Sequence, residues 1–480
     1  MTTQLFERTL FSRLMNIKIS LRIEADDGSI KIIEDVAQLE RGPLTPTNLG
    51  LTLAESKQIL QGIQQEMVSS QVSQYVEQQA FCPDCGQPRK CKGKHKLIYR
   101  SVFGKLTLTS PRFFHCPCQS QATKSFSPLA LLLTERQSPE YLYLQTKFAS
   151  LVSYGLSVQL LDEVLPLNGT LNPSTVRYHL HQMGQKLDDE LGEEQIMYVE
   201  GSPRQWEQLP RPELPLNVGI DGAYIHAHCS KGSKQQRHFE LIVGKSIPDE
   251  GPSKSFGFVQ TYDTKPKRRL FELLKSQGMQ MNQQVTFFSD GGDTVRDLQR
   301  FLNPQAEYLL DWFHVTMRIT QLSQYLRGLK HYDLDNGKSM VERLKSVKWY
   351  LWHGNVFRAL QELEWLEEDA DFLESNYPKL KKMRRAIAEF HTYIQNNGHF
   401  IPNYGERYRC GERISTGFVE STVNQVVAKR MEKKQQMRWT PKGAHLLLQV
   451  RTKVLNQDWK EVVDRWYSPP LKETGVPNAA

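Results

Sequence analysis

The pattern of hydrophobic and polar positions divides the chain into stretches of different secondary structure. Residues 16–36, NIKISLRIEADDGSIKIIEDV, hold two alternating runs around Asp27-Gly28, and this arrangement predicts a β-hairpin. Residues 53–79 have the spacing of apolar positions that is typical of a helix. Helical spacing returns, with short breaks, from 138 to 192.

The spacing of hydrophobic positions changes in the second half of the chain. Residues 195–215 are rich in proline and polar groups, which is typical of a linker. Beyond them come three strand-like runs, LPLNVGIDGAYIHAH, HFELIVGKSI and SKSFGFVQTY. The chain then alternates between the helix TKPKRRLFELLKSQG, the strand QQVTFFSD, the helix TVRDLQRFL and the strand AEYLLDWFHV. This order predicts a mixed-sheet α/β domain, followed by an almost entirely helical stretch over 314–400.

The composition is that of a globular protein. Of the 480 residues, 39% are hydrophobic and 24% are charged, which allows real cores, and the length predicts roughly three domains. The longest apolar patch, PLALLLT, is too short for a membrane span, and the N-terminus lacks the pattern of a secretory signal. We therefore expect a cytoplasmic protein, whose net charge of +8 weakly favours an anionic partner.

Four of the seven cysteines form two close pairs. Cys82 and Cys85 make a Cys-x-x-Cys, and Cys116 and Cys118 make a Cys-x-Cys further along. Short β-rich runs between the pairs would return the chain to one ion, so the pattern predicts a structural Zn²⁺ bound by four thiolates. The odd total and the clustering favour a reducing compartment over disulfides.

Other interpretations of the cysteines stay open. The four could be buried or incidental, and Cys91, His95 or His115 could replace one of the ligands. Cys229 and Cys410 stand alone and are expected to be ordinary core or surface residues. A closed site of four thiolates has no open position, so its role would be structural or DNA-positioning.

Two aspartates follow apolar strand-like runs and precede glycine. Asp221 ends NVGID before Gly222, and Asp290 ends VTFFSD before Gly291-Gly292. Taken singly, each is as well explained by a turn or a helix cap. Together they predict acids that share a crevice at the edge of an α/β sheet and hold Mg²⁺, which prefers carboxylate oxygens. Two ions acting on a phosphate need about three acids, so a third is expected on a helix against the sheet.

A candidate for this third acid lies at the front of a basic helix. Residues 416–445, TGFVESTVNQVVAKRMEKKQQMRWTPKGAH, have the pattern of one amphipathic helix with a basic loop behind it, and Glu420 lies near its start. A phosphate backbone drawn to the cations would pass this carboxylate, and the candidate DNA contacts are Lys429, Arg430, Lys433, Lys434 and Arg438. Alternatively, Glu420 is only a first-turn acid that interacts favourably with the helix dipole, and the basic face only serves solubility. Glu412, in the preceding loop, is the second candidate.

Four longer stretches carry a family resemblance. They are GIDGAYIHA, FFSDGGDTVRDLQRFL, LLDWFHVTMRI and GFVESTVNQVVAKRMEKKQQMRWTPKGAHLLLQVRTKVLN. Over most of 80–457 the chain resembles bacterial insertion-sequence transposases of the ISKra type, which are DDE transposases with an RNase H-like catalytic domain. The resemblance implies a catalytic triad of Asp221, Asp290 and Glu420 that binds two Mg²⁺ or Mn²⁺ ions. It also implies an all-helical insertion in the long interval before Glu420.

The motif DWFH, Asp311 to His314, resembles the Asp/Cys-x-x-His signature that accompanies such an insertion. In similar enzymes this signature lies near the active site, so Asp311 and His314 are near-catalytic candidates. The alternative is a structural pair at a strand end, in which Asp311 satisfies His314. Trp312 could stack on an unpaired base or belong to the core.

The first part of the chain resembles the DNA-end-binding region of such enzymes, a zinc ribbon followed by a helix-turn-helix-like segment. Its candidate reading helix is 173–190, with Arg177, His179 and His181 near the start and Arg177 as the candidate DNA contact. The acidic KLDDEL at the far end leaves only the N-terminal half to face phosphates. The hairpin at 16–36 has no counterpart in this resemblance.

We therefore expect a multidomain α+β and α/β chain. Its segments are an N-terminal hairpin and helix (1–80), a zinc ribbon (81–120), a helical, helix-turn-helix-like DNA-binding segment (125–194), a linker (195–215), an RNase H-like mixed-sheet catalytic core (216–329), an all-helical insertion (330–410), a catalytic-Glu helix with a basic C-terminal segment (411–466) and a disordered tail (467–480).

The resemblance implies a DNA transposase that binds the ends of an insertion sequence. Metal-activated water would cleave a strand, and the freed 3′-OH would attack target DNA. The expected partners are double-stranded DNA, at the element ends and the target, and further copies of the chain in a homodimer or higher multimer on the bacterial nucleoid. The alternatives are a non-transposing nuclease of the same fold and a catalytically silent DNA-binding regulator.

Overall fold

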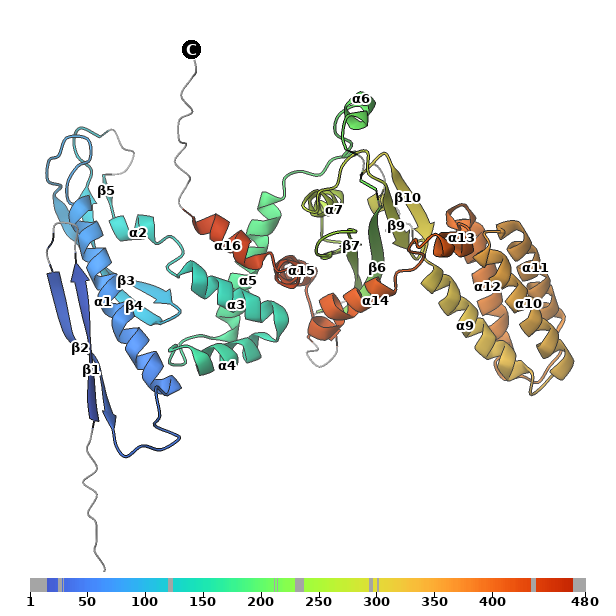
Figure 1. Ribbon diagram of the computed structural model, residues 1–480, viewed down its shortest axis with the longest axis horizontal. Helices are drawn as coiled ribbons and strands as arrows, with labels where there is room; N and C mark the ends of the chain where they lie inside the picture. The colour runs from blue at the N-terminus through green and yellow to red at the C-terminus, as the bar shows by residue number, and fades with distance from the viewer. Residues whose placement is uncertain are drawn as a thin grey trace, which may run out of the picture. The chain divides into compact units, whose positions relative to one another are not determined.

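The computed structural model describes residues 15–24, 28, 30–119, 124–210, 212–213, 215–228, 237–292, 297–299, 302–432 and 437–468 (Figure 1). It divides into two compact units, Met1–His179 with Lys460–Ala480, and Leu180–Trp459. Among the described residues, no helix is both long and apolar enough to cross a membrane. The predicted turn residue Asp27, most of the predicted helix TVRDLQRFL and the tail from 469 lie outside the described residues.

An antiparallel hairpin and a long helix begin the first unit. β1 (Met15–Glu24) pairs with β2 (Ile30–Arg41), and α1 (Leu53–Gln79) follows, so both predicted elements are confirmed. Thr52 and Glu55 close a capping box at the start of α1. The Arg41 guanidinium pairs with the Glu55 carboxylate at 2.5 Å and lowers its pKa to about 2, which ties the strand to the helix.

A three-stranded sheet lies beside the two cysteine pairs, and its β3–β4 hairpin separates them along the chain. β3 (Cys91–Ser101) and β4 (Gly104–Phe114) form a hairpin, and β5 (Ser125–Phe126) pairs antiparallel to β4. Apolar residues alternate along β4, and Leu106 and Leu108 pack in one core with Leu129 of α2 (Pro128–Leu132). The backbone N–H of Phe114 donates to the carbonyl of Lys90 at 3.0 Å, which closes the sheet beside the first cysteine pair.

The predicted helical stretch from 138 to 192 is confirmed. It contains α3 (Pro139–Leu151), α4 (Tyr154–Val164) and α5 (Pro173–Glu190), whose last turns belong to the second unit. The hydroxyls of Ser138 and Ser153 cap α3 and α4 by accepting backbone N–H groups, and the side chain of Asn172 caps α5 in the same way. From Lys460 onward, α16 (Trp459–Tyr467) belongs to the first unit.

A five-stranded mixed sheet organises the second unit. Its strands are β6 (Leu216–His226), β7 (His238–Ile247), β8 (Lys254–Val259), β9 (Val285–Ser289) and β10 (Ala306–Leu310). The spatial order is β10-β9-β6-β7-β8. β7 runs antiparallel to both of its neighbours, so β8, β9 and β10 all run parallel to the central β6. The predicted mixed sheet is confirmed, and its order and directions are those of an RNase H-like fold.

The second unit also contains many helices. They are α6 (Pro203–Glu207), α7 (Pro266–Lys275), α9 (Trp312–Leu329), α10 (Leu334–Trp352), α11 (Val356–Phe372), α12 (Leu380–Asn397), η1 (Gly398–Phe400), α13 (Tyr404–Arg409), α14 (Gly417–Val423), η2 (Asn424–Glu432) and α15 (Pro441–Leu455). Of these, α7, α14 and α15 pack on the sheet. The predicted linker is partly structured, because it contains α6 and because buried Tyr198 stacks on Phe271 of α7 at 4.8 Å.

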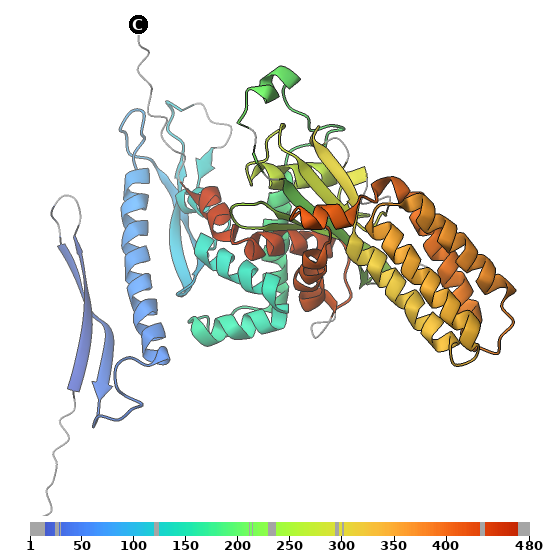
Figure 2. The same cartoon turned by 45° about the vertical axis from the view of Figure 1, so that its right-hand side comes forward.

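The four long helices α9 to α12 lie side by side as a bundle, drawn in yellow to orange (Figure 2). Their shared apolar core takes in Leu310 of β10 and Tyr404 of α13, whose hydroxyl donates to the Leu310 carbonyl at 2.7 Å. The helical insertion therefore begins directly at the edge of the sheet. The core of the insertion includes α9. The domain boundary expected at 330 assigns α9 to the catalytic core instead.

The basic stretch after 416 differs from the single amphipathic helix predicted. α14 is a regular helix, but η2 continues it as a π-helix, whose turns are wider. The Arg451 guanidinium of α15 donates to the carbonyl of Val426 at 2.7 Å. A side chain that takes up a helix carbonyl in this way disturbs the regular backbone ladder, which accounts for the change of helix type.

Opposite faces of the sheet carry different helices. Val218 of β6 faces the core that α7 completes. Because side chains alternate along a strand, Gly219 and Asp221 point to the other face. There, a Cβ on Gly219 would lie 2.1 Å from Cγ2 of buried Val419, so only glycine lets α14 approach β6 this closely.

Replacing Gly219 by alanine should therefore overpack this contact and lower the free energy of unfolding by about 1–3 kcal/mol in urea denaturation. The matched control is Gly257→Ala in β8, whose Cβ would meet nothing closer than 3.5 Å and should cost much less. Combining Gly219→Ala with Val419→Ala should cost less than the two single changes added together. Strict additivity would contradict the contact.

Candidate active site and metal centre

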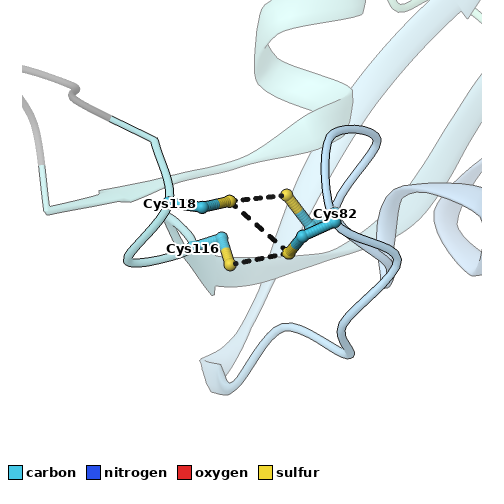
Figure 3. Close-up of side chains that lie close together, drawn as sticks. Cys82, Cys116 and Cys118 are labelled. Carbon is cyan, nitrogen blue, oxygen red and sulfur yellow. Dashed lines mark hydrogen bonds between the residues drawn. The ribbon is translucent and has the colours of Figure 1, made fainter.

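The four predicted cysteines converge on one point (Figure 3). All four Sγ atoms lie within 4.8 Å of one another, and Cys85 Sγ is 3.4 Å from both Cys116 and Cys118. One pair comes from the turn after α1 and the other from the end of β4. Tetrahedral Zn–S bonds of about 2.3 Å put the sulfurs about 3.8 Å apart, so this donor set fits Zn²⁺ with little movement.

The charge balance among the thiols also favours a cation. Neighbouring thiols, with Cys116 foremost, raise the pKa of Cys118. Burial acts to raise the pKa of Cys82, yet the backbone N–H groups of Asp84 and Cys85 bring it down to about 7. A divalent ion would relieve the repulsion that holds the Cys118 proton in place.

The residues considered as substitute ligands have other contacts. Cys91 Sγ donates to the carbonyl of Gly93 at 3.4 Å, and His95 Nε2 lies 3.3 Å from the Ser127 hydroxyl. The ring of His115 packs on Phe126, 4.8 Å between centroids. Cys410 is exposed, and Cys229 lies outside the described residues.

Three aspartates stand at one level of the sheet. In the parallel pair β6–β9, Gly219 lies opposite Phe288, and continuing this register sets Asp221 opposite Asp290. In the pair β9–β10, Ser289 lies opposite Leu310, so the next residue, Asp311, follows at the same level. The expectation that Asp221 ends its strand is wrong, because β6 continues to His226. The neighbouring β9 ends at Ser289, so Asp221 still lies where the parallel pairing stops.

The mutual electrostatics agree with this register. Burial raises the pKa of Asp221, and the charges of Asp290 and Asp311 raise it further, while His314 opposes them. The Asp290 carboxylate accepts the backbone N–H of Gly292 at 3.0 Å. A carboxyl whose ionisation is opposed by burial and by a neighbouring acid, as at Asp221, is suited to share a divalent cation with that neighbour.

Asp311 is a buried hydrogen-bonding centre. Its carboxylate is fully buried and accepts the backbone N–H of Phe313 (3.0 Å), Nδ1–H of His314 (2.9 Å), and the backbone N–H of Thr416 (2.9 Å). The Thr416 hydroxyl is a fourth donor. These bonds cap α9 and fix the residue that precedes α14. With four donors satisfied, Asp311 has little acceptor capacity left for a metal.

His314 is hydrogen-bonded to Asp311 and interacts electrostatically with the other two aspartates. Burial lowers its pKa, but the hydrogen bond and charge of Asp311, with the charges of Asp221 and Asp290, raise it overall. His314 is thus drawn toward its cationic form beside the acids. The Asp311–His314 hydrogen bond matches the alternative in which the two residues form a structural pair. It also keeps His314 near the candidate site.

Glu420 is exposed on α14, one residue after Val419, which packs on Gly219. The helix therefore lies on the face of β6 from which Asp221 projects. Within the described residues, the four cysteines are the only group of three or more potential ligands placed to hold a metal ion, so Glu420 does not form such a group with Asp221 and Asp290. Glu412, the second candidate, pairs with Arg407 at 2.8 Å.

Glu240 of β7 is an acid that the sequence reasoning missed. Burial raises its pKa, a hydrogen bond from Tyr224 lowers it, and the charge of Asp290 raises it. The charge of Asp290 therefore acts on Glu240 as well as on Asp221. The available signal was a single acid inside the apolar run HFELIVG.

The candidate DNA contacts divide into exposed and buried groups. Arg177, Lys429 and Arg438 are exposed. Arg430, expected on the exposed basic face, is instead fully buried, with its guanidinium 5.3 Å from the centre of the Trp439 ring. Lys433 and Lys434 lie outside the described residues.

His179 and His181, also noted near the start of the reading helix, differ in exposure. His179 is buried between Gln137 (2.7 Å) and Gln145 (2.8 Å), so it does not face a ligand. His181 is half-buried. Arg177 is thus the residue of this group whose exposure suits a phosphate contact.

Comparison with known proteins gives little beyond this geometry. No family model matches the chain. No curated protein matches it either. Among solved structures, a match is the Drosophila P element transposase strand transfer complex, with 10% identity, coverage of 70% of this chain and 84% of that chain, and a TM-score of 0.24. A TM-score this low carries no argument about fold or function.

Purified protein should contain one Zn²⁺ per chain, with Zn–S distances of about 2.3 Å by X-ray absorption. The double change Cys116→Ser/Cys118→Ser should abolish binding and destabilise the three-stranded sheet, because metal binding and folding are coupled there. The matched control Cys91→Ser should retain full zinc. A protein without zinc, or a double variant that keeps it, would contradict the assignment.

Thr416→Val should lower the free energy of unfolding by about 1–3 kcal/mol, because the buried Asp311 carboxylate loses a donor. Thr320→Val is the matched control, since the Thr320 hydroxyl bonds only a carbonyl on the exposed face of α9. Urea unfolding of both variants measures the difference. Equal costs for the two would show that the Asp311–Thr416 bond contributes nothing.

Proposed function

We propose that the chain is a DNA transposase that binds the ends of an insertion sequence and performs metal-dependent strand cleavage and strand transfer. One observation carries the proposal: Asp221 and Asp290 lie at the same level of adjacent parallel strands in an RNase H-like sheet. The helix that bears Glu420 packs on the face of β6 from which Asp221 projects.

In this proposal Asp221 and Asp290 hold divalent cations, and Glu420 supplies a further carboxylate from α14. Two bound Mg²⁺ or Mn²⁺ ions would polarise the attacking oxygen and stabilise the leaving one in an in-line displacement at phosphorus. In the first step water attacks, the P–O3′ bond breaks, and a 3′-OH and a 5′-phosphate result. In the second step that 3′-OH attacks a target phosphodiester. The surrounding acids raise the pKa of His314, which favours its cationic form beside the two aspartates.

Double-stranded DNA is the proposed partner. Lys429 and Arg438 are exposed beyond the Glu420 helix, and Arg177 is exposed at the start of α5. The four-cysteine module would hold the N-terminal DNA-binding surface in shape through Zn²⁺. Binding as a homodimer or higher multimer, in the cytoplasm and on the nucleoid, is part of the proposal.

A catalytically silent DNA-binding regulator is the second candidate. It is favoured by the exposure of Glu420, which within the described residues does not form a ligand group with the two aspartates. A non-transposing nuclease of the same fold would use the same acids. Strand transfer of a 3′-OH end separates the transposase from the nuclease, and metal-dependent cleavage separates both from the regulator.

Alanine at Asp221, Asp290 or Glu420 should each reduce cleavage of DNA carrying the repeats that flank the gene by about a thousandfold. Each lost ligand removes several kcal/mol of transition-state stabilisation, while end binding, measured in EDTA, should stay nearly intact. Glu412→Ala is the matched control for Glu420, since it too is an exposed acid near α14. If Glu412→Ala loses cleavage and Glu420→Ala keeps it, Glu420 is not the third acid.

A further inference from the structure

One face of α10 combines tryptophan and lysine. Lys345, Lys348, Trp349 and Trp352 recur at the three- and four-residue spacing that places side chains on one side of a helix. With Trp312, the first residue of α9, they line a cleft of about 420 Å³. This volume lies within the usual range of small-molecule sites. We refer to these five residues as the tryptophan cleft.

The aromatic rings of the cleft differ in exposure. Trp312 and Trp352 pack partly against the bundle core, with ring centroids 5.2 Å apart, and form a fixed wall. Trp349 is 59% exposed, although its ring lies 4.4 Å from that of His353. A rigid wall beside an exposed indole suits a flat ligand that stacks.

The charges of the cleft select an anion. Lys345 and Lys348 are both exposed, and neither forms an ion pair with any residue in the described part of the chain. The two residues lie about one helical turn apart on α10 and line the same cleft as the indoles. A ligand that offers a flat ring and a phosphate satisfies both halves of the cleft at once.

The cleft is also close to the candidate active site along the chain. Trp312 directly follows Asp311, which stands level with Asp221 and Asp290. We propose that the tryptophan cleft binds one unpaired nucleotide of a DNA strand, with the base against the indoles and the phosphates on the two lysines. The nature of the strand rests on the proposed function, but the binding itself needs neither catalysis nor a divalent metal.

The test uses the full chain in EDTA and a ten-nucleotide single-stranded oligothymidylate with 2-aminopurine at its centre. Wild type should bind it and quench the 2-aminopurine fluorescence by stacking. Trp349→Ala should weaken binding about 5- to 100-fold, the range for loss of one base–aromatic stack, and remove the quench. Lys345→Ala/Lys348→Ala should lower the salt slope by about 0.7 per lost phosphate contact.

Matched controls come from the same bundle. Phe372→Ala removes another exposed aromatic ring, and Lys381→Ala/Lys382→Ala removes two other exposed lysines of α12. Both should leave affinity and quench unchanged. Because Trp349 is exposed, its variant should melt like wild type. An unchanged quench in a folded Trp349→Ala chain, or equal losses in the controls, would overturn the proposal.

The outcome is independent of whether the chain cleaves DNA. Asp221→Ala should keep the full 2-aminopurine quench, since it leaves the cleft intact. If cleavage is never observed but the quench depends on Trp349, nucleotide binding in the cleft is supported and the proposed function is contradicted. If cleavage depends on Asp221 while Trp349→Ala binds the oligonucleotide normally, the proposed function is supported and nucleotide binding in the cleft is contradicted.

Discussion

The second unit depends on one buried carboxylate. The chain leaves the sheet for the helical bundle at Asp311 and returns to it at Thr416, and the Asp311 side chain bonds both places. A fully buried charge is stable only when hydrogen bonds replace its lost hydration, and four donors do so here. Because the two ends of the bundle are held together, a long insertion can lie between β10 and α14 without freeing α14 from the sheet.

Small residues then determine how closely the elements approach the acidic edge. Gly219 allows Val419 to pack directly on β6. Gly291 has a φ of +85° and, with a Cβ, would lie 2.4 Å from the side-chain oxygen of Asn397 at the end of α12. The chain can therefore turn immediately after Asp290 only with glycine there. Glycine near each acid thus serves packing, and at Gly291 it also serves conformation.

The elements with a local signature could be predicted from the sequence. Alternation and helical spacing located the first hairpin, α1, the mixed sheet and the helical bundle, and the cysteine spacing located the thiol group. The acids Asp221 and Asp290 were recognisable by their position after apolar runs. Whether these acids bind metal, and whether Glu420 joins them, stays a prediction.

Contacts between distant segments left no such signature. Arg430 and His179 are polar residues on helices, and burial follows only from what packs over them, Trp439 in one case and two glutamines in the other. The π-helix depends on Arg451 from another helix, and the role of Thr416 depends on Asp311. Periodicity describes one element at a time, so it cannot reveal such partners.

The central claim is that Asp221 and Asp290 share a divalent cation. Crystals grown with Mn²⁺ and DNA would test it through anomalous diffraction, because Mn²⁺ can take the place of Mg²⁺ on carboxylate oxygens. The account predicts an anomalous peak within bonding distance of both carboxylates, with Glu420 drawn toward it. Full Mn²⁺ occupancy elsewhere, for example at Glu240 alone, with none between Asp221 and Asp290, would contradict it.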